Sequence, residues 1–351
     1  MNFFGSKKLL GLDIGVSSIK LVEVEVSRDV VTLTSFGFIP TPEGAITGGE
    51  IVDPSAIAQA ITSLASQTKT KIKKACTAMW GSAVITKKIS IPRIDEKLLP
   101  DQLKWEAEQY IPFDIKEINL QYQVLRNIPP PNPEQMNVLL IGAKRDYVLR
   151  YAEVVETAGL ECTIIDVAGF ALANCFLVNY PDYHEKSVVV LNFGAGVTNF
   201  VVIEKSEATF SRDIAVGGNT YTTDIQKTMN VSIQEAEGLK ISASTGQAVP
   251  QDVTDVINQT NEVVAEEIRR SFDFFLATSA EANIEKVFVT GGGMGIPGLF
   301  DQIKNILKLP IENFNPFINV RASKSFTPEY LQQIAPYAGV GIGLAMRQEG
   351  K

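Results

Sequence analysis

Two stretches of the chain share one pattern of hydrophobic and polar positions. The first begins with the hydrophobic run Leu9–Gly15, LLGLDIG, and continues through two alternating, β-rich runs to Phe38. The second begins with Val188–Gly194, VVVLNFG, and continues in the same way to Val216. Alternation with a period of two predicts strands, and glycine-containing turns between them predict hairpins.

The two copies are offset by 179 residues, so that Asp13 corresponds to Asn192 and Gly15 to Gly194. One copy alone predicts no more than a hairpin. Two copies at the starts of two chain halves predict two similar α/β domains that face each other. The cleft between them would offer backbone N–H groups from both glycine turns to one anion.

Further elements follow each copy. After the first, a helix is predicted over 56–67, with Asp53 or Ser55 as its cap, and then a strand over 72–80. Residues 84–162 then mix short strands with two helices and predict an inserted α+β module. Its second helix is expected to start at an Asp146 cap and to end at Gly159.

After the second copy, 221–240 and 252–278 have the spacing of helices, separated by the polar turn 242–251. The segment 286–290 predicts a strand that leads into three consecutive glycines. Small residues over Ala338–Ala345, AGVGIGLA, suit a tightly packed final helix.

Composition narrows the functional classes. A chain of 351 residues with 45% hydrophobic residues suits two domains with sizeable cores. Its net charge of 32 − 40 = −8 argues against a general nucleic-acid binder. The same charge disfavours unaided adsorption to an anionic membrane.

Cysteine and histidine usage excludes several kinds of site. Cys76, Cys162 and Cys175 are far apart and form no CxxC pair, so a zinc site or a disulfide framework is not expected. His184 lies in a polar stretch and reads as a solvated loop residue. No apolar run reaches the roughly 20 residues that span a membrane, and the start lacks a signal-peptide pattern. We therefore expect a cytoplasmic protein.

The order and spacing of these segments resemble the actin-like ATPase superfamily, which includes actin, heat-shock chaperone ATPases, sugar kinases and FtsA. Within it, the chain is most similar to the PilM family of type IV pilus assembly proteins. The resemblance is carried by FFGSKKLLGLDIGVSSIKLVE near the start, by WEAEQYIPFD at Trp105–Asp114, and by IGAKRDYV with AGL within Ile141–Leu160. It implies a two-domain α/β, ribonuclease H-like fold with an FtsA-like inserted α+β subdomain.

The resemblance gives the first hairpin a phosphate-binding role. Backbone N–H groups around Gly15, with the hydroxyl of Ser17 or Ser18, would hold the β- and γ-phosphates of ATP. Asp13 would hold Mg²⁺ through water, in keeping with the oxygen ligands and retained waters of magnesium sites. Lys20 would meet phosphate charge. The alternative for Asp13 is a carboxylate that caps the turn.

The second hairpin resembles the second phosphate loop of the superfamily. Gly194, Gly196 and Thr198 preserve the loop. Many members have Asp where this chain has Asn192. An amide hydrogen-bonds water but supplies no negative charge for Mg²⁺, so ATP binding is expected and fast hydrolysis is not.

Three further segments match nucleotide contacts in the superfamily: a Gly-Gly turn, an ExxK pair and a glycine-rich loop that would approach ribose and base. Their residues are Gly217 and Gly218, Glu237 and Lys240, and Gly292, Gly293 and Met294. Glu237 and Lys240 share a helix face. A surface ion pair stays open as the alternative for that pair, and a helix-capping loop for the glycines.

Asp166 is the one carboxylate in Ile164–Val178, which resembles the first connecting helix of the superfamily. The resemblance makes Asp166 a candidate catalytic, water-orienting residue, and a helix N-cap is the alternative. Since the rest of this stretch is nearly all apolar, slow turnover is expected.

The resemblance also implies a domain division. Subdomain 1A would comprise 1–83, 163–185 and 332–351, with 84–162 as the inserted subdomain 1C. Subdomain 2A would comprise 186–222 and 283–331, and subdomain 2B 223–282. The chain stops shortly after its final helix, so the C-terminal linker and amphipathic helix of FtsA are not expected.

The implied function is nucleotide-dependent assembly at the inner membrane. The expected partner is the short cytoplasmic N-terminal tail of PilN, bound in extended form beside the inserted subdomain. Gln109–Phe113 is either a contact for this tail or a packing element. Other platform proteins and the pilus motor ATPases are further expected partners, and membrane association would be indirect. The alternatives are an FtsA-like filament former and a small-molecule kinase, which would need a catalytic carboxylate that the sequence does not supply.

Overall fold

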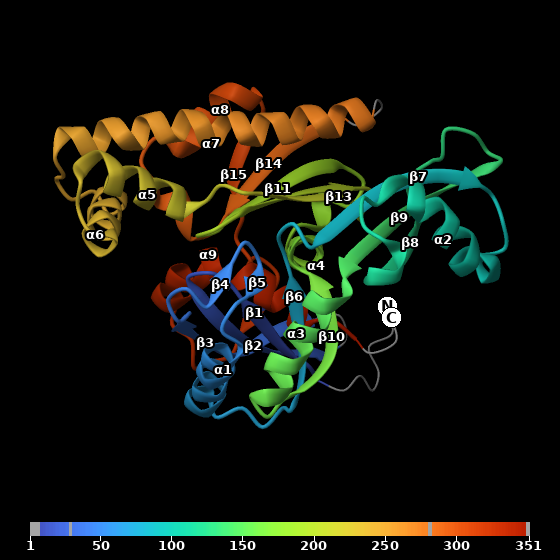
Figure 1. Ribbon diagram of the computed structural model, residues 1–351, viewed down its shortest axis with the longest axis horizontal. Helices are drawn as coiled ribbons and strands as arrows, with labels where there is room; N and C mark the ends of the chain where they lie inside the picture. The colour runs from blue at the N-terminus through green and yellow to red at the C-terminus, as the bar shows by residue number, and fades with distance from the viewer. Residues whose placement is uncertain (1–7, 28–29, 280–282, 349–351) are drawn as a thin grey trace.

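The computed structural model describes residues 8–27, 30–279 and 283–348, and the structural statements below concern these ranges. The part of the opening motif before residue 8 lies outside them. Figure 1 shows a lower lobe built around β1 to β3, an upper lobe built around β11 to β14, and a smaller unit of strands and one helix to their right. None of the described helices is long and apolar enough to cross a membrane.

The first sheet contains the N-terminal repeat. β1, β2 and β3 pair antiparallel in sequence order, and β6, β10 and β16 join parallel to their neighbours. In sheet order the strands are β10 (Glu161–Val167), β6 (Lys74–Met79), β1 (Leu10–Ile14), β2 (Ser18–Ser27), β3 (Val30–Pro40) and β16 (Arg321–Ala322). A separate small hairpin pairs β4 (Ile46–Thr47) with β5 (Glu50–Ile51).

The second sheet repeats this arrangement. β11, β12 and β13 pair antiparallel, and β14 and β15 extend the other side in parallel. In sheet order the strands are β13 (Glu207–Ile214), β12 (Thr198–Glu204), β11 (Ser187–Phe193), β14 (Ile284–Thr290) and β15 (Ile311–Asn313). The prediction of two similar α/β halves, each started by one copy of the repeat, is confirmed.

Nine α-helices are formed by the described residues. They are α1 (Pro54–Thr68), α2 (Leu99–Tyr110), α3 (Arg145–Thr157), α4 (Ala168–Asn179), α5 (Gly218–Met229), α6 (Ile233–Ser244), α7 (Gln251–Thr278), α8 (Leu299–Leu307) and α9 (Pro328–Ala345). Short 3₁₀ turns are η1 (Glu96–Leu98), η2 (Ile115–Glu117), η3 (Pro181–Tyr183) and η4 (Gly292–Gly295).

Alternation along β11 divides its side chains between two cores. Val188 and Val190 belong to the core that also contains residues of α4 and α9, whereas Val189 and Leu191 belong to the core under α5 and α7. Successive side chains of a strand point to opposite faces, so the second sheet is buried on both sides. α4 and α9 pack against each other between the two sheets (Figure 1).

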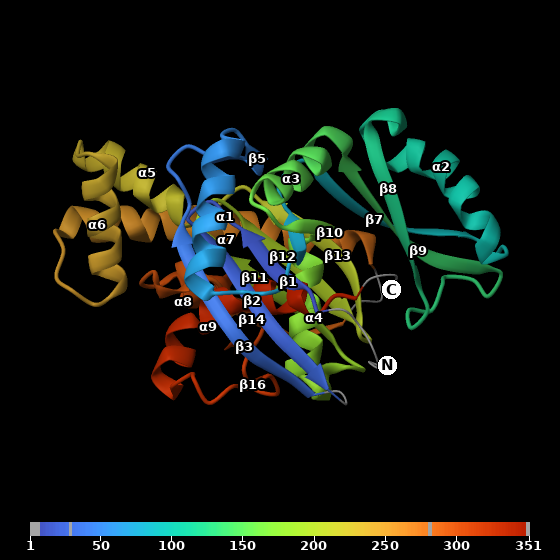
Figure 2. The same cartoon turned by 90° about the horizontal axis from the view of Figure 1, so that it is seen from below.

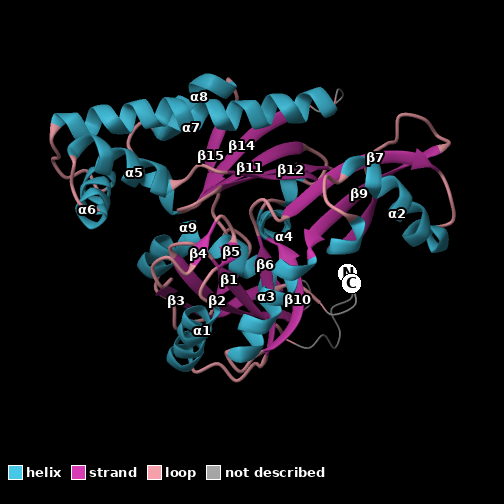
Figure 3. Ribbon diagram, in the orientation of Figure 1, coloured by secondary structure: helices cyan, strands magenta, loops and turns pink. Residues whose placement is uncertain are grey.

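The inserted segment forms its own three-stranded antiparallel sheet. Its order is β7 (Val84–Pro92), β9 (Gln135–Lys144) and β8 (Ile118–Leu125). α2 packs on this sheet, and Leu103 shares a small core with Val138 and Leu140. Figure 2, a view from below, and Figure 3 show this unit beside the two larger sheets. The α+β expectation for the insertion is confirmed for its three strands and α2, whereas α3, which was expected within the insertion, packs with α1 in the core of the first sheet.

Two helix boundaries differ from the sequence prediction. The single helix expected over 221–240 is two helices, α5 and α6. Asn230 ends α5 in the left-handed region at φ 52°, and Ser232 caps α6 by accepting a hydrogen bond from the N–H of Glu235. Glu235 bonds back to Ser232, which completes a capping box. The capping box lies inside a continuous helical spacing, so the spacing alone does not reveal this turn.

Helix starts are specified by local hydrogen bonds. Asp53, one of two candidates, caps α1 by accepting from the N–H of Ala56. Asp146 does not cap α3, because that helix begins at Arg145 after Lys144, with no side-chain cap. Gly159 follows α3 with φ 79°, as expected for a residue just past a helix.

Two expected divisions of the chain also change. The connecting helix begins at Ala168 and not at Ile164, because residues up to Val167 pair with β6 as strand β10. β16 pairs with β3 of the first sheet, although residues up to 331 were expected in the second domain. The chain therefore returns to the first sheet before α9 begins. The remaining subdomain boundaries stay a proposal.

Candidate nucleotide site between the two sheets

The first hairpin brings a charged pair to the end of β1. Asp13 and Lys20 are opposite each other in the β1–β2 register, and Lys20 Nζ lies 3.2 Å from Asp13 Oδ2. The side chain of Lys20 is only 12% exposed and that of Asp13 only 14%. The N–H of Gly15 donates to the carbonyl of Ser18 and closes the turn. A cation and an anion are therefore held side by side beneath a glycine turn.

The second hairpin places two amides at the corresponding positions. Asn192 and Asn199 are opposite each other, and Asn192 Nδ2 donates to Asn199 Oδ1 at 2.8 Å. The turn closes through the N–H of Gly194, which donates to Val197. The two copies therefore place their paired residues at the same positions of the hairpin. The pair is an ion pair in the first copy and a neutral hydrogen bond in the second.

The N-terminus of α5 supports the second turn. The N–H groups of Gly218 and Asn219 donate to the carbonyls of Gly194 and Ala195 at 2.9 and 2.8 Å. A side chain at Gly217 would lie 2.6 Å from those same two carbonyl oxygens, so the close approach requires glycine. The positive end of the α5 dipole consequently lies at the turn, where it favours a bound anion.

A cavity of about 490 Å³ lies between the two hairpins. Both turns line it, as do Ala168 at the start of α4, residues of α6 and the glycines after β14. This volume is within the range of small-molecule sites. Two helix N-termini and Lys20 face a common space, an arrangement suited to phosphate groups.

The α6 wall carries Glu237 and Lys240. Lys240 is 12% exposed, and its Nζ donates to Glu237 at 2.6 Å, to Thr222 Oγ1 at 2.9 Å and to the carbonyl of Gly218 at 3.2 Å. These contacts tie α6 to α5. The alternative of a solvent-exposed surface ion pair does not describe Lys240, although Glu237 keeps 43% of its side chain exposed toward the cavity.

The glycine-rich loop forms the opposite wall. Gly292 and Gly293 line the cavity within the turn η4. A side chain at Gly292 would lie 2.7 Å from the ring of Tyr337, which comes from α9 and is 46% exposed. The aromatic ring therefore packs directly against the loop, and a side chain at Gly292 would displace it.

The cavity gathers most of the residues that the sequence singled out. Those that line it are Asp13, Gly15, Ser17, Lys20, Asn192, Gly194, Gly196, Gly218, Glu237, Lys240, Gly292 and Gly293. Ser18, Thr198, Gly217, Met294 and Asp166 do not line it. Thr198 is fully buried and donates its hydroxyl to the carbonyl of Val216, and Met294 lines a different, smaller pocket.

Sequence reasoning missed several lining residues. Tyr337, Trp80 and Asn199 face the cavity from α9, from the end of β6 and from β12. The signal for Asn199 was present, since the repeat aligns it with Lys20. Trp80 and Tyr337 had no such signal, because single aromatic residues at element ends are usual in ordinary cores.

Asp166 lies outside this cavity and has a different partner. Its Oδ2 is 3.1 Å from Nε of Arg347, just beyond α9, and its Oδ1 accepts from the N–H of Val167. Burial raises the pKa of Asp166, while Arg347 and that N–H lower it. It is not the N-cap of α4, since Val167 occupies that position without a side-chain bond. The structure thus gives Asp166, in β10, a contact with the segment just after α9 and no place in the cavity.

Comparison with known proteins agrees with this geometry. A solved structure described as the PilM-PilN type IV pilus biogenesis complex superposes with a TM-score of 0.86 and 29% identity, over 97% of this chain and 98% of that chain. MreB5 of Spiroplasma citri, solved bound to ADP, superposes with a TM-score of 0.50 and 14% identity, over 89% of this chain and 93% of that chain. The cell division protein FtsA of Streptococcus pneumoniae is 27% identical over 290 residues, which cover 75% of this chain and 62% of that relative.

Two repeated hairpin sheets on either side of a shared cavity, with α4 and α9 between them, are an actin-like ATPase fold. The family described as type IV pilus assembly protein PilM matches residues 11–349. The chain belongs to that PilM family, and the resemblance inferred from sequence is confirmed.

Proposed function

We propose that this chain binds Mg²⁺ and ATP between its two sheets and couples the bound nucleotide to assembly of the type IV pilus platform. The observation that carries the proposal is the cavity of about 490 Å³ lined by both glycine turns of the repeat. Lys20 and the N-termini of α4 and α5 would receive the phosphates, and Glu237, Lys240, Gly292 and Gly293 would surround the nucleoside.

The donor set fits a magnesium ion that is held mostly by phosphates and water. Asp13 is the carboxylate that lines the phosphate side, and Asn192 faces it from the other hairpin. No cluster of three or more His, Cys, Asp or Glu residues that would hold a metal occurs among the described residues. Magnesium commonly binds through one or two carboxylates and substrate phosphates, so Asp13 through water is sufficient.

Hydrolysis would be slow in such a site. Phosphoryl transfer depends on positioning a water molecule and on stabilising charge. Asp166 is engaged with Arg347, and Asn192 donates its amide to Asn199. Asp166 therefore does not face the nucleotide, and Asn192 is an amide, so neither provides a carboxylate that could orient the attacking water. The bound state would then last long enough to be read by partners.

The proposed partner is the cytoplasmic N-terminal tail of PilN, with further platform proteins and the motor ATPases reading the same state. The solved PilM-PilN complex, which covers nearly all of this chain, supports this choice. The chain would act in the cytoplasm and reach the inner membrane through such partners. A bound ligand changes a conformational equilibrium only through different affinities for the two states, so tail binding should depend on nucleotide.

The test is isothermal titration of the full chain with a synthetic PilN tail peptide, with and without Mg²⁺ and ATP. We expect saturable binding whose affinity changes at least about fivefold with nucleotide, the lower end of usual allosteric coupling. A peptide of the same composition in scrambled order is the control and should not bind. Absence of tail binding in the presence of ATP would count decisively against the partner assignment.

A further inference from the structure

Three hydrogen bonds connect the second glycine turn to the beginning of the inserted subdomain. Asn192, which lines the cavity, donates to Asn199 at 2.8 Å. Asn199 Nδ2 donates to Asp213 Oδ1 at 2.6 Å, and the N–H of Gly81 donates to Asp213 Oδ2 at 2.5 Å. Gly81 lies just before β7, so this relay runs from the nucleotide cavity to the point where the insertion leaves the first sheet.

The relay has a fixed direction. A backbone N–H only donates, so Gly81 requires an acceptor, and Asp213 accepts from Gly81 at Oδ2 and from Asn199 at Oδ1. Asn199 must therefore turn its NH₂ group toward Asp213, which leaves its carbonyl for the residue at position 192. That residue must donate, and Asn donates where Asp does not. The relay thereby accounts for an amide at the position where many superfamily members have a carboxylate.

The environment makes the relay costly to break. Asn199 is 4% exposed. Burial raises the pKa of Asp213, whereas the hydrogen bonds from Asn199 and Gly81 lower it. A buried polar group left without a partner destabilises the fold, so each of these groups constrains its neighbours.

The residue before Gly81 is bonded to the other turn. Trp80 is 5% exposed, lines the cavity, and donates its Nε1–H to the carbonyl of Ile14 at 3.0 Å. Ile14 is the last residue of β1, immediately before the first glycine turn. Gly81 has φ 90°, and a side chain there would lie 2.6 Å from the carbonyl oxygen of Gly48. The Trp80–Gly81 junction is thus bonded to the end of β1 on one side and to Asp213 of β13 on the other.

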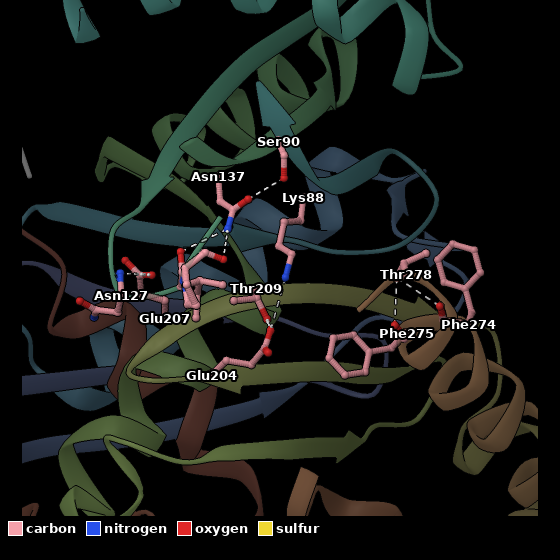
Figure 4. Close-up of polar contacts among 12 residues, drawn as sticks. Lys88, Ser90, Asn127, Asn137, Glu204, Glu207, Thr209, Phe274, Phe275 and Thr278 are labelled. Atoms are coloured by element: carbon pink, nitrogen blue, oxygen red, sulfur yellow. Dashed lines mark hydrogen bonds and ion pairs between the residues drawn. The ribbon is translucent and has the colours of Figure 1, made fainter. Parts of the chain in front are cut away.

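The inserted subdomain is also docked on the second sheet. Glu207 accepts from the N–H groups of Arg126 and Asn127 at 2.9 and 3.0 Å, and Thr86 Oγ1 donates to Ser211. Figure 4 shows Asn127 beside Glu207, and Lys88 reaching toward Glu204. The insertion belongs to the first half by its chain connections and to the second by these contacts.

We propose that the relay Asn192–Asn199–Asp213–Gly81, with Trp80, transmits occupancy of the nucleotide cavity to the inserted subdomain and so sets its orientation for partner binding. Asp213 and Asn199 are positioning residues in this scheme, because they act through Asn192 and Gly81. The proposal rests on the proposed function, since it requires that nucleotide binds at the two turns.

Hydrogen exchange of the full chain tests the relay. We expect saturating Mg²⁺ and a non-hydrolysable ATP analogue to change exchange at 81–88 by about tenfold in wild type, a typical coupling. In Asp213→Ala, which removes both acceptors outside the cavity, nucleotide should still bind and exchange at 81–88 should no longer respond. Thr86→Val is the matched control, because it removes the two hydrogen bonds of Thr86 with Ser211 across the same seam but leaves the relay and the response intact.

An exchange of the two end residues gives a stricter test. Asn192→Asp alone sets two acceptors face to face and should abolish the response at saturating nucleotide. Asn192→Asp combined with Asp213→Asn restores a consistent relay of opposite direction, and the response should return. A wild-type response in Asp213→Ala, or none in the nucleotide-bound double variant, would overturn the relay. Failure of wild type to bind nucleotide would instead overturn the proposed function itself, and with it the relay.

Discussion

Gly343→Ala is expected to destabilise the chain by about 3 kcal/mol or more, or to prevent folding. Gly343 lies in α9, where a Cβ atom would overlap the backbone carbonyl oxygen of Ala171 in α4. A backbone atom has no alternative rotamer, so the two helices would have to separate. α4 and α9 lie between the two sheets, and their separation would disturb both domains and the cavity.

The measurement is chemical denaturation of both variants followed by circular dichroism. Gly238→Ala is the matched control, because Gly238 lies in α6 and a Cβ atom there meets nothing within 4 Å. The same substitution in that open position should stabilise the chain by up to about 1 kcal/mol, the helix-propensity difference. Equal stability of Gly343→Ala and wild type would show that the two helices are not closely packed.

Lys20→Ala is expected to weaken ATP binding at least tenfold, equivalent to about 1.4 kcal/mol. Lys20 lies 3.2 Å from Asp13, and both side chains are nearly buried. Without the lysine, the phosphates would meet an uncompensated carboxylate, and two charges 4 Å apart near a protein surface interact by about 4 kcal/mol. Equilibrium dialysis with labelled ATP measures the change.

Two further variants test whether the effect on ATP affinity is specific to charges that line the cavity. Lys8→Ala removes a lysine that pairs with Glu25 on the exposed surface, and ATP affinity should stay within about twofold because such pairs are weak and screened. Asp13→Ala should lose the part of ATP binding that depends on Mg²⁺ and keep the part that does not. Unchanged Mg²⁺-dependent binding in Asp13→Ala would remove Asp13 from the proposed site.

Most local features were predictable because neighbouring residues decide them. The hairpins follow from alternation and glycine turns, and the α1 cap follows from one carboxylate three residues before Ala56. Pattern alone did not locate the break between α5 and α6, since the hydrophobic spacing continues across Asn230 and only the Ser232–Glu235 box marks the new start. Asp146 failed as a cap because the chain enters α3 directly from β9.

The residues of the candidate site also fall into two groups, those that a local pattern reveals and those that only tertiary packing brings together. Glycine turns and their partner residues are repeated in sequence, so Asp13, Lys20, Asn192 and Gly194 were found. The sequence did not reveal the position of Asp166, because its charged partner, Arg347, is distant along the chain and reaches it only through the packing of α9. Tyr337 was missed for the same reason, since its contact with Gly292 joins two elements that share no local pattern.

The sequence by itself determined the two-fold α/β plan, the inserted α+β unit and the two turns that face each other, because backbone propensity and a repeated pattern act over short distances. Only the tertiary structure decided what each polar group bonds to. Asn192 read alone is a lost magnesium ligand; in the fold it is the donor that begins a relay through Asn199 and Asp213 to Gly81. Hydrogen-bond direction depends on which donors and acceptors the folded chain brings within 3 Å, and the spacing of residues along the chain does not encode that.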